Sequence, residues 1–259
     1  MKKSKIAVLV AMVVVLAFSL AACGGSDKSS SDKTVYKVGT EPTFPPFDTT
    51  DEDQNIVGLD MDLIKAIGED QGFDVEFENL SFDGLIPALK AGNIDIVAAG
   101  MNKDDEDRQK EVDFSDSYYE SKLFVAVTED NTTIKSVEDL TPDMKVAAQT
   151  GTTGASKVQE LKDAGKIKEA VILDGLDTCM MKLINGDVSA VINDKPVTEA
   201  YMKKQPDKVK MVGEALNAEN YGFAVAKGND ELLEKINAGL ANIKEDGTFD
   251  KLVDEWFNK

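Results

Sequence analysis

The residue of this chain with the most distinctive chemistry is its one arginine. The sequence has 29 basic residues, and Arg108 is the only one that is not a lysine. A guanidinium can bind a carboxylate through two parallel hydrogen bonds, whereas a lysine ammonium acts as a point charge. Arg108 is therefore a candidate for holding an anionic group. The alternative is a surface residue that balances the acidic run over residues 104–107.

Two aromatic loops and one small-residue loop add further candidates. Glu41 and Phe44 lie in a loop stiffened by prolines, and Phe82 stands directly before a predicted helix. Either ring could instead pack in the core, Phe82 as a hydrophobic staple on its helix. Gly100 and Asn102 follow an apolar run, and this loop offers backbone donors.

A threonine-rich loop and an aspartate complete the set. Residues 149–154, QTGTTG, open onto a predicted helix. Small residues, hydroxyls and free amides at a helix N-terminus make an anion site, although the threonines could also be ordinary caps. Asp194 places a carboxylate after another short apolar run. An arginine, a helix N-terminus, aromatic faces and carboxylates together suit a free α-amino acid, which carries one anion and one cation.

The elements that must position these residues alternate between short apolar strands and amphipathic helices. Strands are predicted over residues 35–39, 75–78, 94–98, 123–128, 145–148, 170–173, 190–192 and 221–225. Helices are predicted over residues 59–71, 84–91, 137–140, 156–164, 179–184, 195–203, 230–244 and 248–257. The alternation favours an α/β architecture with mostly parallel sheets, and about 225 residues suit two lobes. Ligands of such sheets bind beyond the carboxyl ends of the strands, where the candidates lie.

The N-terminus has the pattern of a secretory signal. Basic residues precede an apolar run over residues 6–20, and small residues then lead to Cys23. The sequence LAAC resembles the bacterial lipobox, in which the cysteine is lipidated. A transmembrane helix, the alternative, needs about 20 apolar residues. We predict a signal peptide over residues 1–22, a palmitate-type lipid anchor on Cys23 and a flexible tether over residues 23–34.

Composition excludes several classes of function. Cleavage would remove three lysines and move the formal net charge from −19 to −22. A body this acidic should not bind nucleic acid, whose phosphates need a basic face. Once Cys23 is acylated only Cys179 remains, so we expect a small buried thiol and no internal disulfide. The chain has no histidine, and no zinc or haem site is expected.

The order of short motifs resembles the polar amino acid-binding proteins of ABC importers, which are family 3 solute-binding proteins. The motifs are VGTEPTFPPF, GLDMDLIKAIG, FDGLIPAL, DRQKEVDFSDSYY, QTGTTG, INDKP and YGFAVAKG. They run colinearly over residues 35–257 and are similar to those of glutamine- and lysine/arginine/ornithine-binding proteins. The resemblance implies the type II periplasmic-binding-protein fold, in which two hinge strands join lobes that close on an amino acid. It implies neither catalysis nor a cofactor.

The resemblance also assigns roles to the candidates. Arg108, five residues before the DFS triplet, would bind the ligand carboxylate, and Asp194 would bind the ammonium. The predicted carboxylate contacts are Arg108, Asn102, Thr152 and Thr153; the ammonium contacts are Asp194 and Gly100; the side-chain contacts are Glu41, Phe44, Phe82 and Gln149. Asn102 departs from the family's threonine, and the loop from Gly100 to Arg108 is one residue longer than usual.

These observations predict a lipid-anchored receptor at the outer face of the cell membrane. Lobe 1 would comprise residues 35–119 and 221–259, and lobe 2 residues 120–220, with crossovers near residues 119–122 and 217–221. Because Glu41 suits a cationic or amide side chain, we expect glutamine or a basic amino acid, delivered by a monomer to ABC permease subunits. The alternatives are a cyclohexadienyl dehydratase-like enzyme with Glu41 as acid or base, and a sensory binding lipoprotein.

Overall fold

The computed structural model describes residues 33–258, and Thr34–Lys259 form one compact unit. The predicted signal peptide and Cys23 lie outside the described residues, as does most of the tether. Within the described part, no helix has the length and hydropathy needed to span a membrane. The fold below is that of the compact unit.

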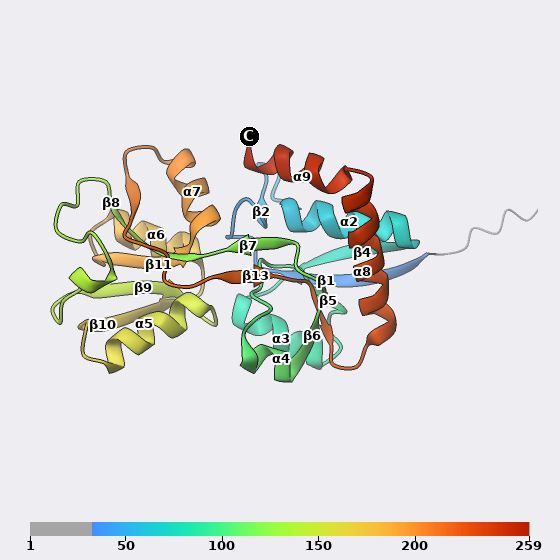
Figure 1. Cartoon of the computed structure of the whole chain (residues 1–259), viewed down its shortest axis with the longest axis horizontal. Coiled ribbons are helices and arrows are strands. Elements are labelled where there is room, and N and C mark those ends of the chain that lie inside the picture. The colour runs from blue at the N-terminus through green and yellow to red at the C-terminus, as the bar shows by residue number, and fades with distance from the viewer. Residues whose placement is uncertain (1–32, 259) are drawn as a thin grey trace, which may run out of the picture. The chain divides into compact units, whose positions relative to one another are not determined.

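The first of two large sheets has the strand order β4-β1-β5-β14-β6. Its strands are β1 (Thr34–Thr40), β4 (Phe73–Asn79), β5 (Ile96–Val97), β6 (Val112–Phe114) and β14 (Ala224–Ala226). Its helices are α2 (Leu59–Gln71), α3 (Phe82–Lys90), α4 (Glu106–Glu111), α8 (Asp230–Glu245) and α9 (Thr248–Phe257). Helices α2, α8 and α9 lie on one face of this sheet, and α3 and α4 on the other (Figure 1). We call this sheet and its helices lobe 1.

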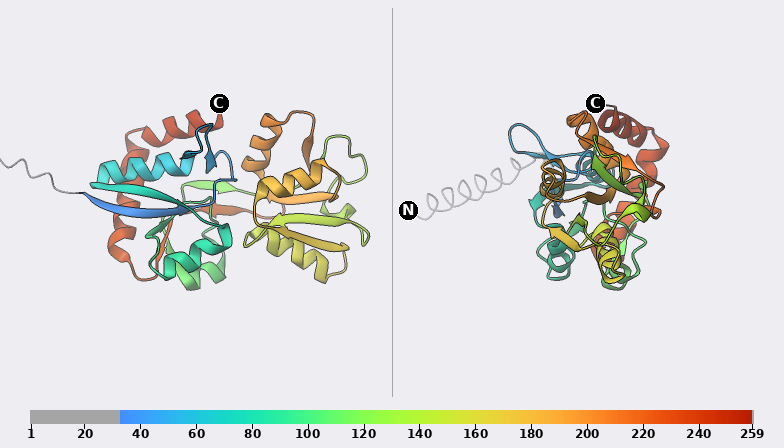
Figure 2. Two further views of the ribbon diagram at one scale, coloured as in Figure 1. Left: turned by 180° about the vertical axis from the view of Figure 1, so that it is seen from behind. Right: turned by 90° about the vertical axis from the view of Figure 1, so that its left-hand side faces the viewer.

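The second sheet has the strand order β10-β9-β11-β8-β12. Its strands are β8 (Leu123–Thr128), β9 (Lys145–Gln149), β10 (Glu169–Leu173), β11 (Ala190–Asp194) and β12 (Val209–Val212). Its helices are α5 (Thr153–Asp163), α6 (Leu176–Ile184) and α7 (Lys195–Lys204), with a 3-10 turn, η1, at Val137–Asp139. Figure 2 shows α6 and α7, in orange, on the face opposite α5, in yellow. We call this assembly lobe 2.

Two short strands carry the chain between the sheets. Strand β7 (Tyr119–Ser121) leads from β6 to β8, and β13 (Glu219–Tyr221) leads from β12 back to β14. They pair antiparallel, with Tyr119 opposite Tyr221, and run side by side between the lobes (Figure 1). A small hairpin, β2 (Thr49–Thr50) and β3 (Ile56–Val57), precedes α2. The two crossovers fall within the segments expected from the sequence.

The elements form where the apolar pattern and the chain-breaking glycines place them. Helix α2 begins after Gly58 and ends at Gly72, which adopts the left-handed conformation common after a helix. Its buried side chains include Leu63, Ile64 and Ile67, which follow the predicted helical spacing and face α8. The predicted α/β architecture with two sheets is therefore confirmed.

The sheets differ from the sequence prediction in being mixed. In each one, two neighbouring pairs are parallel and two are antiparallel. All antiparallel pairs involve β14 or β8, the two strands that directly follow a crossover. Parallel neighbours need a long return connection, usually a helix, whereas these two strands are reached without one. For the same reason the predicted strand over residues 221–225 divides into β13 and β14, because the chain passes from the crossover into the sheet there.

Candidate functional site

All ten residues that the sequence proposes for the site line one cavity between the lobes. The lining residues are Glu41, Phe44, Phe82, Gly100, Asn102, Arg108, Gln149, Thr152, Thr153, Asp194 and Glu219. Only the last of them is absent from the sequence prediction. The cavity has a volume of about 10 Å³. That is room for about one water molecule, so an amino acid can enter only if the walls move apart.

Arg108 is buried at the centre of this cavity, with 9% of its surface exposed. Its Nη1 donates to the carbonyl oxygen of Asn102 at 3.2 Å, and its Nη2 donates to that of Gly151 at 2.9 Å. The guanidinium carbon lies 5.4 Å from the centre of the Phe82 ring. Burial lowers the pKa of Arg108, against the raising effect of Asp105 and other nearby acids. Arg108 is therefore a buried residue of the cavity rather than a surface charge.

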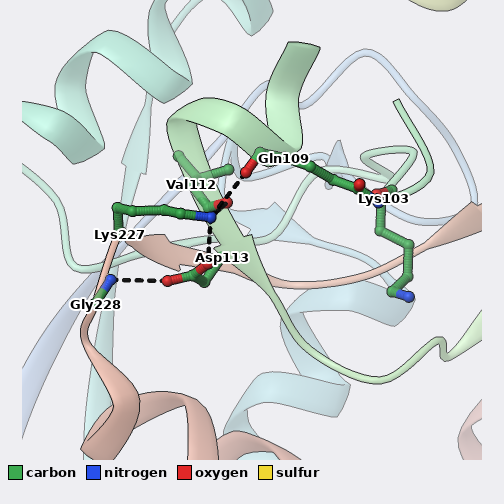
Figure 3. Close-up of polar contacts among 6 residues, drawn as sticks. All are labelled: Lys103, Gln109, Val112, Asp113, Lys227 and Gly228. Carbon is green, nitrogen blue, oxygen red and sulfur yellow. Dashed lines mark hydrogen bonds and ion pairs between the residues drawn. The ribbon is translucent and has the colours of Figure 1, made fainter. Parts of the chain in front are cut away.

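The short helix α4 that carries Arg108 is fixed to its lobe at its C-terminus (Figure 3). Lys227 Nζ donates to the carbonyl oxygens of Gln109 at 2.8 Å and Val112 at 3.3 Å. The same nitrogen lies 2.6 Å from Asp113 Oδ1, and the backbone nitrogen of Gly228 donates to Asp113 Oδ2 at 2.7 Å. A cation that contacts the last carbonyls of a helix stabilises that end. Lys227 and Gly228 of the YGFAVAKG motif thus contact Asp113 of the DFS triplet, close to the C-terminus of α4.

The acidic run before Arg108 caps the start of the same helix. Asp105 Oδ1 accepts hydrogen bonds from the backbone nitrogens of Asp107 and Arg108, both at 3.0 Å. Asp104 Oδ2 accepts from Asn220 Nδ2 at 2.7 Å, which ties the loop to β13. Because acidic side chains are favoured near a helix N-terminus, the run stabilises α4 and does not face the cavity as a cluster.

Asn102, which replaces the family's threonine, has its side-chain oxygen engaged within the protein. Its Oδ1 accepts from the backbone nitrogen of Asp104 at 3.0 Å and from that of Asn220 at 3.4 Å. Its carbonyl oxygen is the one that accepts from Arg108. Asn102 therefore shapes the loop and orients the arginine.

Gly100 adopts a backbone conformation that other residues rarely take, with φ of 53°. A Cβ atom there would lie 2.7 Å from the Phe44 ring, so the close approach of ring and backbone requires glycine. The Gly100 nitrogen donates to Asp60 Oδ2 at 2.7 Å, and the Tyr118 hydroxyl donates to the same oxygen at 2.7 Å. Asp60 is fully buried, and burial raises its pKa to about 7. The sequence prediction missed this support, which comes from α2.

Glu41 and Gln149 form one wall of the cavity from opposite lobes. Gln149 Nε2 donates to Glu41 Oε2 at 2.8 Å, and Thr43 Oγ1 donates to the same oxygen at 2.8 Å. Burial raises the pKa of Glu41, while the hydrogen bonds from Gln149 and Thr43 lower it. A buried carboxylate here favours a ligand group that carries a positive charge or N–H donors.

The threonine loop presents the N-terminus of α5 to the cavity. Thr152 Oγ1 accepts from the Ala155 nitrogen at 3.0 Å and lies 2.7 Å from the carbonyl oxygen of Gln149, to which it donates. This hydroxyl proton is therefore used within the loop, as the capping interpretation expects. Gly151, with φ of 76°, approaches Asp83 so closely that a Cβ atom would lie 2.9 Å from the aspartate Cβ. The loop thus touches the opposite lobe at a residue that must be small.

Asp194 ends β11 and is held by both crossover strands. Its Oδ1 accepts from Ser121 Oγ at 2.9 Å and from the Tyr221 hydroxyl. Its pKa is raised to about 8, first by burial and next by the negative charge of Glu219, against lowering by the Tyr221 and Ser121 hydrogen bonds. Glu219 is 2% exposed and lies on β13. No motif marked Glu219, whose one sequence signal is its place in the second crossover.

Two further kinds of reactive group were considered among the described residues, possible metal ligands and the thiol of Cys179. Among residues 33–258, no group of three or more histidine, cysteine, aspartate or glutamate side chains could hold a metal ion. Cys179 is buried in α6, and burial raises the pKa of its thiol to about 12. It is the small buried thiol that the sequence predicts.

Comparison with known proteins places the chain among solute receptors. Residues 36–259 match the model for bacterial extracellular solute-binding proteins, family 3. The chain is 34% identical over 265 residues to the putative ABC transporter arginine-binding protein 2 of Escherichia coli (strain K12), with 100% of each chain covered.

Solved structures of similar proteins have the same fold. An ancestral arginine-binding protein bound to arginine is 45% identical with a TM-score of 0.82, covering 87% of this chain and 99% of that one. A structure of an ancestral arginine-binding protein bound to glutamine is 46% identical with a TM-score of 0.80, covering 88% and 99%. The ancestral amino acid-binding protein AncCDT-1, a precursor of cyclohexadienyl dehydratase, is 38% identical with a TM-score of 0.79, covering 86% and 95%.

Proposed function

We propose that this chain, which belongs to the bacterial extracellular solute-binding proteins of family 3, binds an L-amino acid with a cationic or amide side chain. It is an amino acid-binding protein of the ABC transporter type and has the two-lobe type II fold. It is a binding protein rather than an enzyme, as its relatives are, and AncCDT-1 is itself named as an amino acid-binding protein. It acts outside the cytoplasm with an ABC importer.

The observation that carries this proposal is the balance of charge around the cavity. One guanidinium, that of Arg108, faces three carboxyl groups, those of Glu41, Asp194 and Glu219. A ligand carboxylate would take the guanidinium, and the ligand ammonium would take Asp194. Glu41, at the other end, would then accept N–H groups from the side chain, which suits arginine, lysine or glutamine and disfavours glutamate and aspartate.

Binding would proceed by closure of the two lobes. Arg108, Phe44 and Phe82 belong to lobe 1, whereas Thr153 and Asp194 belong to lobe 2. The bonds that now join the lobes, such as Arg108 to Gly151, would exchange for bonds to the ligand. Contacts that exist only when both lobes touch the ligand shift the population toward the closed form. A micromolar complex needs about 8 kcal/mol, which two charge-assisted contacts and ring packing can supply.

The assignment is tested by a thermal-shift screen of the twenty amino acids with the purified protein. We expect arginine, lysine or glutamine to raise the melting temperature and glutamate and aspartate to leave it unchanged, because a ligand that binds only the folded state stabilises it. The proposed class is wrong if acidic amino acids give the largest shift. No shift with any of the twenty would contradict amino-acid binding itself.

We propose further that the protein is a monomer anchored to the membrane through lipid on Cys23. The support is the sequence pattern of residues 1–23, a basic start, an apolar run and LAAC. Metabolic labelling with a palmitate analogue should mark the wild type and not Cys23→Ser. Wild-type protein found unlabelled in the medium would contradict the anchor.

A further inference from the structure

Glu219 shares the candidate cavity with Asp194 and is almost completely buried there. It is 2% exposed, and its Oε1 accepts a hydrogen bond from Asn217 Nδ2 at 2.8 Å. Asn217 in turn accepts from the Leu123 nitrogen at 3.0 Å through Oδ1, so the side chain that orients Glu219 is itself fixed to lobe 2. A carboxyl group fixed in this way at the cavity wall is positioned to contact a molecule bound in the cavity.

Asp194 and Glu219 lie within hydrogen-bonding reach of each other, and the negative charge of Glu219 acts on Asp194. One oxygen of Asp194 is already occupied by Ser121 and Tyr221, and one oxygen of Glu219 by Asn217. Burial and the negative charge of Glu219 raise the pKa of Asp194 to about 8, so Asp194 carries a proton near neutral pH when no ligand is bound.

The surroundings do not neutralise this pair. Within residues 33–258, no lysine or arginine forms an ion pair with either carboxyl group. The charged and titratable groups around the pair are Arg108, Asp105 beside that arginine, Tyr119, Tyr221, and the pair Lys195–Glu199 at the start of α7. The negative charges of both carboxyl groups act on Arg108, but its guanidinium donates its hydrogen bonds to backbone carbonyl oxygens.

We propose that Glu219 binds the ligand's α-ammonium together with Asp194, and that the ammonium replaces the proton on Asp194. An ammonium donates three hydrogen bonds, and Asp194, Glu219 and Gly100 all line the cavity, so two carboxyl groups and one backbone carbonyl can supply three acceptors. No covalent bond changes; the displaced proton passes to the solvent, and the charge of the pair is then balanced by the ligand. This inference rests on the proposed amino-acid-binding function and adds a residue and a proton to it.

Binding is then linked to proton release. The affinity falls as the pH falls below about 8, because the proton competes with the ammonium for the same oxygens, by up to about tenfold per pH unit. The effect is the same for arginine, lysine and glutamine, since all of them present the same α-ammonium. A linkage that arose at Glu41 would instead differ between cationic and neutral ligands.

The test is titration calorimetry of the whole protein with the amino acid that gives the largest thermal shift. Measurements at about pH 6.5 in two buffers of different ionisation enthalpy give the protons released per ligand, and we expect about one for the wild type. Glu219→Gln should release much less and should bind about tenfold more weakly at about pH 8.5, where the proton no longer competes. Glu120→Gln, which removes one charge from the exposed face of the other crossover strand, should match the wild type.

The outcomes separate this inference from the proposed function. Wild-type binding without proton release, or an unchanged proton count and affinity in Glu219→Gln, overturns the inference while amino-acid binding stands. No heat of binding with any amino acid overturns the function itself. If Glu219→Gln does not fold, Glu219→Asp keeps the carboxyl group and should retain proton release with weaker binding; loss of release in a folded Glu219→Asp would also count against the inference.

Discussion

Gln149 Nε2 donates a hydrogen bond of 2.8 Å to Glu41 Oε2, and the two residues belong to different lobes. Gln149 ends β9 in lobe 2, and Glu41 follows β1 in lobe 1. Thr43 extends the same junction, because its hydroxyl oxygen accepts from the Leu176 nitrogen at 3.2 Å and its carbonyl oxygen accepts from the Tyr201 hydroxyl at 3.3 Å. Contact between the lobes and one part of the cavity lining thus depend on the same short loop.

Glu41→Gln should change which amino acid is bound. Replacing the carboxylate by an amide removes a charge-assisted partner, so affinity for arginine and lysine should fall by about tenfold to a hundredfold while that for glutamine changes little. Calorimetric affinities for the three ligands measure the change. Asp177→Asn is the control, since this exposed acid acts on Glu41 through its charge and does not line the cavity. Equal losses for all three ligands would contradict the role given to Glu41.

Arg108→Lys should abolish most binding while the protein stays folded. Lysine keeps the charge but cannot form the bidentate contact with a carboxylate, and we expect a loss of about a hundredfold or more for every ligand. Lys110→Arg, on the exposed side of the same helix, is the control because its pair with Asp107 is at the surface. Near-normal affinity in Arg108→Lys would return Arg108 to the surface-charge interpretation.

Lys227→Met should weaken binding without changing selectivity. Lys227 is not among the residues that line the cavity, but its ammonium contacts the carbonyl oxygens at the C-terminus of α4. Its loss should therefore misplace Arg108 and lower all affinities by about tenfold in parallel. The ratio of arginine to glutamine affinity is the informative measurement. Lys110→Met removes a lysine from the same helix and should have little effect. A changed ratio in Lys227→Met would contradict a positioning role.

Because the pKa of Asp60 is raised, we expect the free energy of unfolding to fall as the pH rises. The pKa of Asp60 is about 7 in the folded protein, above the ordinary aspartate value of 3.8, mainly because of burial. Its contribution to stability is fully present below the unfolded-state pKa and is lost as the pH rises through about 7. The melting temperature without ligand should therefore decrease between about pH 5 and pH 8, by an amount that corresponds to a few kcal/mol at most.

Asp60→Asn isolates this contribution. The asparagine does not titrate, so the decrease in melting temperature over the same pH range should become smaller, with the other carboxyl groups of raised pKa, Asp48, Glu41 and Asp194, supplying the remainder. Glu69→Gln, an exposed change on the same helix, should keep the wild-type slope. An identical slope in Asp60→Asn would show that the buried carboxyl group does not titrate in this range.

Much of the fold could be predicted because its signals are local. Helices α2 and α9 have the predicted bounds, since apolar spacing and flanking glycines define them within the segment itself. Strands β6 and β12 and helix α4 were not predicted. All three have six residues or fewer; the strands pair with strands far along the chain and α4 is held by Lys227, so no local pattern reveals them.

The sequence by itself determined which residues line the cavity wherever a motif at the end of a strand marked them, from Glu41 to Asp194. It also determined the class of protein, because the colinear motifs belong to one family. Only the tertiary structure decided the roles of Glu219 and Asp60, which reach the site from a crossover strand and from α2. The physical reason is that burial in the cavity and contacts such as that of Asp60 with the Gly100 nitrogen join residues far apart in the chain, so no local pattern reveals them.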